Sequence, residues 1–282
     1  MEKVGVVGGG LMGSGIAEVV ARAGLDTVIV EATLEAAHAA EARVRDSIGR
    51  GVARGKISEV DAAEVLGRIL VTTDLGALAD RDLVVEAASE REDIKLDLFA
   101  KIGALLEKDD AVLASNTSSI PIVKLGAVSG RADRVMGVHF FNPAPVMQLV
   151  ELIPSLTTSR DTYTATKTFV SEKLGKQPIE ATDRAGFVVN SLLVPYLLSA
   201  IRMYEAGYAA AADIDKGMIL GCGHPMGPLA LCDLIGLDTV RAIGVSMYEE
   251  FKEPLYSPPP LLDRMVEAGL LGKKSGQGFY AY

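Results

Sequence analysis

Short, continuously apolar runs alternate with longer amphipathic runs in the first half of the chain. The apolar runs are rich in Val and Ile, which is typical of strands buried on both faces of a parallel sheet. We expect strands at residues 4–7, 27–30, 69–72, 83–87, 112–115 and 135–139. Helical periodicity predicts helices at 13–23, 34–54 and 92–106, and a capping box at 58–61 predicts another. The alternation predicts an α/β fold with a Rossmann-type, doubly wound parallel sheet.

After residue 183 the pattern of apolar positions changes. Only helical signals remain, at residues 188–208, 214–220, 229–234, 238–251 and 261–268, separated by glycine and proline clusters. We therefore expect two domains in the 282-residue chain, an α/β domain over 1–183 and an all-helical domain over 184–282. Helical domains that expose many Leu, Val and Met side chains often gain further burial by dimerising.

Composition excludes several classes of protein. Hydrophobic residues make up 49% and charged residues 23%, which is enough apolar material for a large core and excludes general disorder. The net charge of −9 argues against nucleic-acid binding, because phosphate recognition needs a basic surface. Any bound anion must therefore be held locally, by backbone donors or by a small basic cluster.

Cysteine usage and hydropathy predict a soluble cytoplasmic protein. Cys222 and Cys232 cannot form a disulfide framework, and no Cys/His cluster has the spacing of a metal site, so no metal is expected. The longest apolar stretch, 187–201, is interrupted by Asn190 and Pro195 and is too short for a comfortable membrane span. The first residues lack the pattern of a secretory signal.

Residues 8–13 (GGGLMG) have the G-x-G-x-x-G pattern between a predicted strand and a predicted helix. Gly8 permits the tight turn, Gly10 allows the backbone to approach a pyrophosphate, and Gly13 lets helix and strand pack closely. The first helical turn, with Leu11 and Met12, would offer free N–H groups and a partial positive charge to the phosphates. The pattern predicts dinucleotide binding, and a strand–helix turn that binds no nucleotide is the alternative.

An acidic residue, Glu31, ends the second predicted strand, eighteen positions after Gly13. Such a carboxylate accepts hydrogen bonds from the adenosine ribose and repels a 2′-phosphate. The residues that follow, 32–34, include no Arg or Lys that would attract that phosphate. The sequence therefore favours NAD over NADP.

Of the three histidines, only His139 lies in a pattern that suggests chemistry. It ends a predicted strand, and Glu151 lies in another strand-like run, so a hairpin centred on Pro145 would place the two side chains opposite each other. The carboxylate would fix the imidazole tautomer, and the other ring nitrogen would serve as the base that alcohol oxidation requires. A purely structural His–Glu contact is the alternative. His38 and His224 are expected to be a solvated helix residue and a turn residue.

A polar cluster, residues 114–119 (ASNTSS), follows another predicted strand. In open α/β sheets, ligands bind beyond the carboxyl ends of the strands. The hydroxyl groups of this cluster are therefore candidates for binding a substrate oxygen. Capping of a helix is the competing interpretation.

Five segments occur in the order and at the spacing of one known family: 8–13, 114–119, 139–143 (HFFNP), 186–190 (GFVVN) and 272–280 (GKKSGQGFY). With them, the whole chain resembles the L-3-hydroxyacyl-CoA dehydrogenase family, and its length resembles that of stand-alone bacterial members acting on 3-hydroxybutyryl-CoA. The resemblance implies reversible, NAD-dependent oxidation of (S)-3-hydroxybutyryl-CoA to acetoacetyl-CoA. It also implies a homodimer formed through the helical domain.

The resemblance further implies roles for individual residues. His139 would be the general base, oriented by Glu151. Ser118 and Asn190 would hydrogen-bond the region of the substrate's 3-oxygen, and Asn142 would help to place the nicotinamide and the reacting carbonyl. The further cofactor contacts that the resemblance implies are Glu90, Lys95, Ser118 and Lys274.

A basic stripe independently supports a CoA thioester as the substrate. Arg43, Ser47, Arg50 and Arg54 lie at i, i+4, i+7 and i+11 on one face of a predicted helix, and Lys56 follows. On an acidic protein, this stripe is a candidate site for the CoA phosphates. Ser47 and Arg54 also match substrate-binding positions of the family. A solvated charged face is the alternative.

Two other functions stay open at this point. Free 3-hydroxyacid dehydrogenases share a Rossmann domain followed by helices, but they have a catalytic Lys on the first helix after the domain junction. The predicted helix 188–208 contains no Lys. A non-catalytic dinucleotide-binding protein on the same fold would not need His139, Glu151, Ser118 and Asn190 together, and all four are present.

Overall fold

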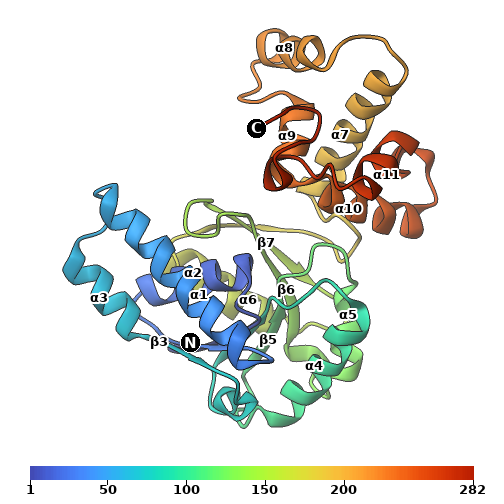
Figure 1. Ribbon diagram of the computed structural model, residues 1–282. Coiled ribbons are helices and arrows are strands. Elements are labelled where there is room, and N and C mark those ends of the chain that lie inside the picture. Colours follow the sequence, from blue (N-terminus) through green and yellow to red (C-terminus); the bar gives the residue numbers. More distant parts are fainter. The chain divides into compact units, whose positions relative to one another are not determined.

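The computed structural model describes residues 1–282, which divide into two compact units, Met1–Asp183 and Arg184–Tyr282. We call them the N-terminal unit and the helical unit and describe each by itself (Figure 1). The N-terminal unit contains one sheet with helices on both faces, and the helical unit consists of helices followed by a short tail.

The sheet of the N-terminal unit has eight strands in the order β3-β2-β1-β4-β5-β6-β7-β8. Neighbouring strands from β3 to β6 are parallel, β7 is antiparallel to β6, and β8 is parallel to β7. The bounds are β1 Lys3–Val7, β2 Asp26–Val30, β3 Ile69–Thr72, β4 Leu83–Glu86, β5 Val112–Ser115, β6 Val135–Phe140, β7 Leu149–Pro154 and β8 Gln177–Glu180. The strand order reverses between β1 and β4, the switch point at which such sheets bind ligands. The doubly wound α/β fold is therefore confirmed.

Six helices cover the two faces of this sheet. Their bounds are α1 Leu11–Arg22, α2 Leu34–Ala53, α3 Glu59–Gly67, α4 Glu92–Leu105, α5 Ile122–Val128 and α6 Arg160–Thr168. The Thr33 hydroxyl accepts the Ala36 N–H at the start of α2, and Ser58 caps α3 by accepting the N–H of Asp61. The helix start predicted at 58–61 is therefore confirmed, and Thr33 is a cap that the sequence pattern did not single out.

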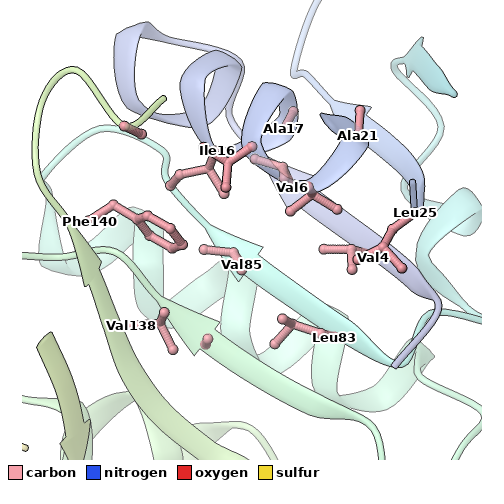
Figure 2. Close-up of a cluster of buried hydrophobic side chains, with 14 of the residues drawn as sticks. Val4, Val6, Ile16, Ala17, Ala21, Leu25, Leu83, Val85, Val138 and Phe140 are labelled. Carbon is pink, nitrogen blue, oxygen red and sulfur yellow. The ribbon is translucent and has the colours of Figure 1, made fainter. Parts of the chain in front are cut away.

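One face of the sheet forms the larger core with α1 and neighbouring helices (Figure 2). Val138 and Phe140 of β6 both point into this core, together with Val6 and Val85 from β1 and β4. Successive side chains of a strand point to opposite faces, so His139 points to the other face, which α4 and α5 cover (Figure 1). The same alternation places Glu86, the last residue of β4, and Ser115, the last residue of β5, on the same face as His139.

The helical unit consists of α7 Val189–Glu205, α8 Ala211–Cys222, α9 Pro228–Ile235, α10 Leu237–Phe251 and α11 Pro260–Glu267. Its own core is built on Leu197, Leu198, Leu237 and Met247, all fully buried. Two buried carboxylates connect segments of this unit. Asp215 of α8 accepts the N–H groups of Leu229 and Ala230 in the first turn of α9. Asp233 of α9 accepts the backbone N–H groups of Phe279 and Tyr280 in the tail. No helix of the structure has the length and apolarity needed to cross a bilayer.

Several elements were not expected from the sequence. Helix α5 is only seven residues long, and α6 ends in a π-helical segment, Phe169–Lys173, so neither shows a sustained period. Strand β8 lies at the sheet edge with mostly exposed side chains, and it lacks the apolar run of a buried strand. The expected strands and helices are present, with ends that differ mostly by one to three residues.

Candidate active site

The glycine loop lies between the end of β1 and the start of α1. Gly8 has φ +93°, and a Cβ there would lie 2.8 Å from the Ala87 carbonyl oxygen. A Cβ on Gly13 would lie 1.7 Å from the carbonyl oxygen of Gly8, so close packing of turn and helix requires glycine. A Cβ on Gly10 would meet nothing within 4 Å. Leu11 and Met12 begin α1 here, so the loop has the shape and the N–H groups of a phosphate cradle.

Glu31 directly follows β2 and reaches the glycine loop. Its Oε1 accepts the N–H of Gly9 at 2.6 Å, which places a carboxylate beside the loop where an adenosine ribose would bind. Arg43 of α2 also reaches this loop, where its guanidinium donates to the Gly9 carbonyl at 3.1 Å. Arg43 lies twelve positions after Glu31 in the sequence, outside residues 32–34, which contain no Arg or Lys.

His139 and Glu151 face each other across the hairpin of β6 and β7. The strands pair these two residues in register, and His139 Nδ1 lies 2.7 Å from Glu151 Oε2. Glu151 is fully buried and His139 is 7% exposed, so the contact lies in a low-dielectric environment that strengthens it. The ring of Phe141 packs beside the imidazole, with ring centroids 4.7 Å apart.

Asn116 connects the end of β5 to the strand of His139. Its Oδ1 accepts the N–H of Phe140 at 2.8 Å, and Phe140 lies three residues past Gly137, the last residue of β6 that pairs with β5. The side chain therefore extends the hydrogen bonding between these strands to the residue after His139. Sequence reasoning treated the cluster 114–119 only as a source of hydroxyl groups, although its asparagine was visible in the motif.

A buried ion pair lies at the carboxyl ends of β4 and β5. The ammonium of Lys95 is 2.6 Å from Glu86 Oε1, and the other oxygen of Glu86 accepts the hydroxyl of Ser115 at 2.7 Å. Glu86 is fully buried and Lys95 is 1% exposed. Lys95 also lies 3.3 Å from Glu90 Oε2. This enclosure favours a role for Lys95 in holding Glu90, whereas the family resemblance implied a direct cofactor contact.

Glu90 ties the loop after β4 to the loop after β5. Its carboxylate accepts the hydroxyl of Thr117, the N–H of Ser118 at 3.0 Å and the hydroxyl of Ser119 at 3.0 Å. Burial alone would raise the pKa of Glu90, but the Lys95 ammonium and these donors hold it below its usual value. Thr117 also accepts the N–H of Ile120 in the turn before α5, but the N-cap residue of α5 is Pro121, so no hydroxyl of this cluster caps that helix.

The remaining predicted residues lie in several separate places. Asn142 follows β6 in the loop between His139 and Glu151, and Asn190 is a buried residue in the first turn of α7. Lys274 lies in the tail of the helical unit, where its ammonium is 2.7 Å from Asp238 Oδ2. Of the basic stripe, Ser47 and Arg50 lie on α2. Arg54 is the C-cap residue of this helix, and Lys56 follows two residues later.

The other two histidines take no part in this arrangement. His38 is exposed on α2, and His224 Nδ1 lies 3.1 Å from the hydroxyl of Tyr196 within the helical unit. No group of three or more His, Cys, Asp or Glu side chains is suited to holding a metal ion. His139, near the carboxyl end of β6 and hydrogen-bonded to the buried Glu151, is suited to proton transfer.

A glycine cradle at the switch point of a doubly wound sheet, with a buried His–Glu pair on β6 and β7 of the same sheet, defines a dinucleotide-dependent oxidoreductase. Residues 3–184 match the NAD binding domain of 3-hydroxyacyl-CoA dehydrogenase, and residues 186–282 match the C-terminal domain of the same enzymes. The chain belongs to the 3-hydroxyacyl-CoA dehydrogenase family, and its N-terminal unit is an NAD-binding domain.

Individual relatives agree with this assignment. The chain is 54% identical to the 3-hydroxybutyryl-CoA dehydrogenase of Mycobacterium tuberculosis, over 100% of this chain and 99% of that protein. It is 42% identical to the human mitochondrial hydroxyacyl-coenzyme A dehydrogenase, over 100% and 91% of the two chains. The crystal structure of (S)-3-hydroxybutyryl-CoA dehydrogenase PaaH1 from Ralstonia eutropha has a TM-score of 0.94 at 45% identity, covering 100% and 99% of the chains.

The buried ion pair makes a testable contribution to stability. The change Lys95→Met leaves the Glu86 carboxylate buried without its ammonium, so we expect the free energy of unfolding to fall by about 3–5 kcal/mol. The matched control is Lys101→Met on the same helix, which breaks an exposed pair with Asp97 and should cost less than about 0.5 kcal/mol. Urea unfolding followed by circular dichroism measures both. Equal, small losses would contradict the account of the pair.

Proposed function

We propose that this protein catalyses reversible, NAD-dependent oxidation of (S)-3-hydroxybutyryl-CoA to acetoacetyl-CoA. Membership of the 3-hydroxyacyl-CoA dehydrogenase family gives the reaction class. The choice of the four-carbon acyl chain is supported by relatives of that name that match over the full chain. The observation that carries the proposal is the buried hydrogen bond between His139 and Glu151 within an NAD-binding domain.

We assign cofactor binding to the glycine loop and the residues around it. Gly8, Gly10 and Gly13, with the first-turn N–H groups of Leu11 and Met12, are suited to the pyrophosphate. Glu31 is suited to the ribose hydroxyls of adenosine, and Glu90, positioned by Lys95, to the groups beyond the pyrophosphate. Lys274 and Asn142 are further candidates, implied by the family resemblance.

His139 is assigned as the general base in oxidation and the general acid in reduction. When bound, NAD accepts the hydride that leaves C3, and NADH returns it in the reverse direction. His139 Nε2 takes the proton of the 3-hydroxyl group, so the C3–O bond becomes a carbonyl as the hydride departs. Glu151 holds the proton on Nδ1, fixes the orientation of the ring and stabilises the imidazolium that forms.

Three polar residues are assigned to the region of the substrate's oxygen. Ser118, Asn142 and Asn190 carry hydroxyl or amide donors that can stabilise negative charge developing on the 3-oxygen. The Ser118 backbone is held by Glu90, which supports a fixed position for its hydroxyl. The assignment of Asn142 and Asn190 rests on the family resemblance and on their chemistry.

The CoA phosphates are assigned to the basic end of α2. Ser47, Arg50, Arg54 and Lys56 combine a hydroxyl donor with three cations, and the three basic side chains are exposed. Arg43 belongs to the same stripe in sequence, but its contact with the Gly9 carbonyl places it at the glycine loop. An anion-binding site made of several cations can recognise the nucleotide part of CoA on a chain of net charge −9.

Two further properties belong to the same proposal. We propose a homodimer formed through the helical unit, because that unit exposes large apolar side chains, including Leu192, Tyr208 and Leu220. We also propose that the enzyme works in the cytoplasm, since Cys222 and Cys232 are both free thiols, as a reducing compartment favours.

The first test is a direct assay of the reaction. Purified protein is mixed with acetoacetyl-CoA and either NADH or NADPH, and loss of reduced-nicotinamide absorbance is followed. We expect rapid loss with NADH, slow loss with NADPH because of Glu31, and a decrease of about 10³-fold in His139→Ala with NADH binding retained.

Turnover of His139→Ala at the wild-type rate would contradict the assigned base, and preference for NADPH would identify Arg43 as dominant over Glu31. NADH binding without any turnover would favour a non-catalytic protein.

The carboxylate partner of the histidine gives a second prediction. Glu151→Gln keeps the size and a hydrogen-bond acceptor but removes the charge, so we expect the fold to persist and kcat to fall about 10²-fold. Steady-state kinetics and the melting temperature are measured together. Glu172→Gln, at an exposed position of the same unit, is the matched control and should leave kcat unchanged. A wild-type pH–rate profile for Glu151→Gln would remove the carboxylate from the mechanism.

The basic end of α2 gives a third prediction. Replacing Arg54 and Lys56 by Ala should raise the KM for acetoacetyl-CoA about 10-fold with little change in kcat, because charged hydrogen bonds to phosphate are lost. Acetoacetyl-N-acetylcysteamine, a thioester without the nucleotide, should react equally well with wild type and the double variant. Arg45→Ala, which alters an exposed ion pair on the same helix, is the control. An unchanged KM in the double variant would contradict the CoA-binding assignment and would favour the alternative, a solvated charged face.

A further inference from the structure

Lys176 is a buried lysine that the mechanism above does not use. It lies directly before β8 and is only 5% exposed. Its ammonium donates to two backbone carbonyls, those of Ala144 and Met147, at 2.8 Å each. Both acceptors belong to the loop that joins β6 to β7, residues 141–148.

This loop is restrained from two sides. On one side, the Lys176 ammonium bridges its turn, in which the N–H groups of Val146 and Met147 both donate to the Pro143 carbonyl. On the other side, the loop packs on α1, because a Cβ on Gly15 would lie 3.3 Å from atoms of both Ala144 and Pro145. The loop therefore lies between the helix that starts at the glycine loop and the edge of the sheet.

The restrained loop joins the two members of the His–Glu pair. It begins after His139 and ends before Glu151, and it carries Asn142. A loop of eight residues between two strands has many conformations, and ordering it costs conformational entropy. The two bonds from Lys176 select one of these conformations, and with it one position for the backbone of Asn142.

A buried ammonium is an expensive way to stabilise a loop. Its two acceptors are neutral carbonyls, and burial lowers the pKa of Lys176 because it disfavours the charged form. Three other charged side chains line the same surface hollow: Lys173 pairs with Glu2, Arg22 pairs with Glu18, and the exposed Glu172 forms no ion pair with Lys176. An apolar side chain would avoid the desolvation of the ammonium, so stability alone does not explain this lysine.

We propose that Lys176 is a positioning residue for the dehydrogenase reaction, which acts by holding the loop 141–148 so that Asn142 lies correctly relative to His139. The inference rests on the proposed function, since it assigns Lys176 to that same site. Lys176 touches neither of the catalytic side chains, and it acts through the two carbonyls that it binds. Small misplacements of groups around a reacting centre have large effects on rate.

The test is the change Lys176→Met, which keeps the length of the side chain and removes its donors. We expect kcat for acetoacetyl-CoA reduction to fall about 30-fold, because the loop becomes mobile. The dissociation constant for NADH should change less than about 3-fold, since Asn142 is only one of its proposed contacts and the glycine loop, Glu31 and Glu90 lie outside the loop 141–148. Lys176→Arg, which can donate to both carbonyls, should restore most of kcat. Lys173→Met, at an exposed position three residues earlier, should match wild type.

Hydrogen exchange measures the loop without reference to activity. In Lys176→Met, amides of residues 141–148 should exchange faster, whereas the amides of β6 and β7 should not. Unchanged exchange and unchanged kcat would overturn the inference, and so would a kcat loss in Lys176→Met that Lys176→Arg does not relieve. If the wild-type protein shows no turnover at all, the proposed function fails, and the exchange comparison then decides the restraint by Lys176 on its own.

Discussion

The pairing register of β6 and β7 is the constraint on which the site depends. It places His139 opposite Glu151, and a slip of one residue would send the two side chains to opposite faces of the sheet. The register is set by the alternation along each strand, because Val138, Phe140, Val150 and Leu152 belong to the larger core. The apolar packing on one face therefore fixes the geometry of the acid–base pair on the other.

Buried charged side chains fix the loops that follow β4 and β5. Glu86 ends β4 inside the protein, so it needs the ammonium of Lys95 and the hydroxyl of Ser115 to offset its loss of hydration. Lys95 in turn supports Glu90, which fixes the backbone of Ser118. The edge of the sheet is thus held by a connected set of polar contacts, each with a partner. Such a network positions groups more rigidly than exposed ion pairs would.

Much of the fold and the central pair could be predicted from the sequence, because these features follow from short-range patterns. The order of strand, glycine motif and helix predicted the NAD-binding cradle, and the symmetric spacing of His139 and Glu151 about Pro145 predicted their contact. Hydrogen bonds between segments distant in sequence have no such pattern and were not predicted. They join Arg43 to the Gly9 carbonyl, Asn116 to the Phe140 N–H, and Lys176 to the loop 141–148. Strand β8 and helix α5 were missed because an exposed edge strand and a seven-residue helix have weak periodicity.

The account depends most on Glu151 holding the proton of His139 on Nδ1. Nitrogen-15 NMR of the histidine side chains tests this directly, because the chain has only three histidines and His139→Ala identifies the signal of interest. At a pH where the ring is neutral, we expect a protonated Nδ1 with a strongly downfield proton and an unprotonated Nε2, and loss of that downfield signal in Glu151→Gln. A neutral ring protonated on Nε2 in the wild-type protein would contradict the proposed mechanism.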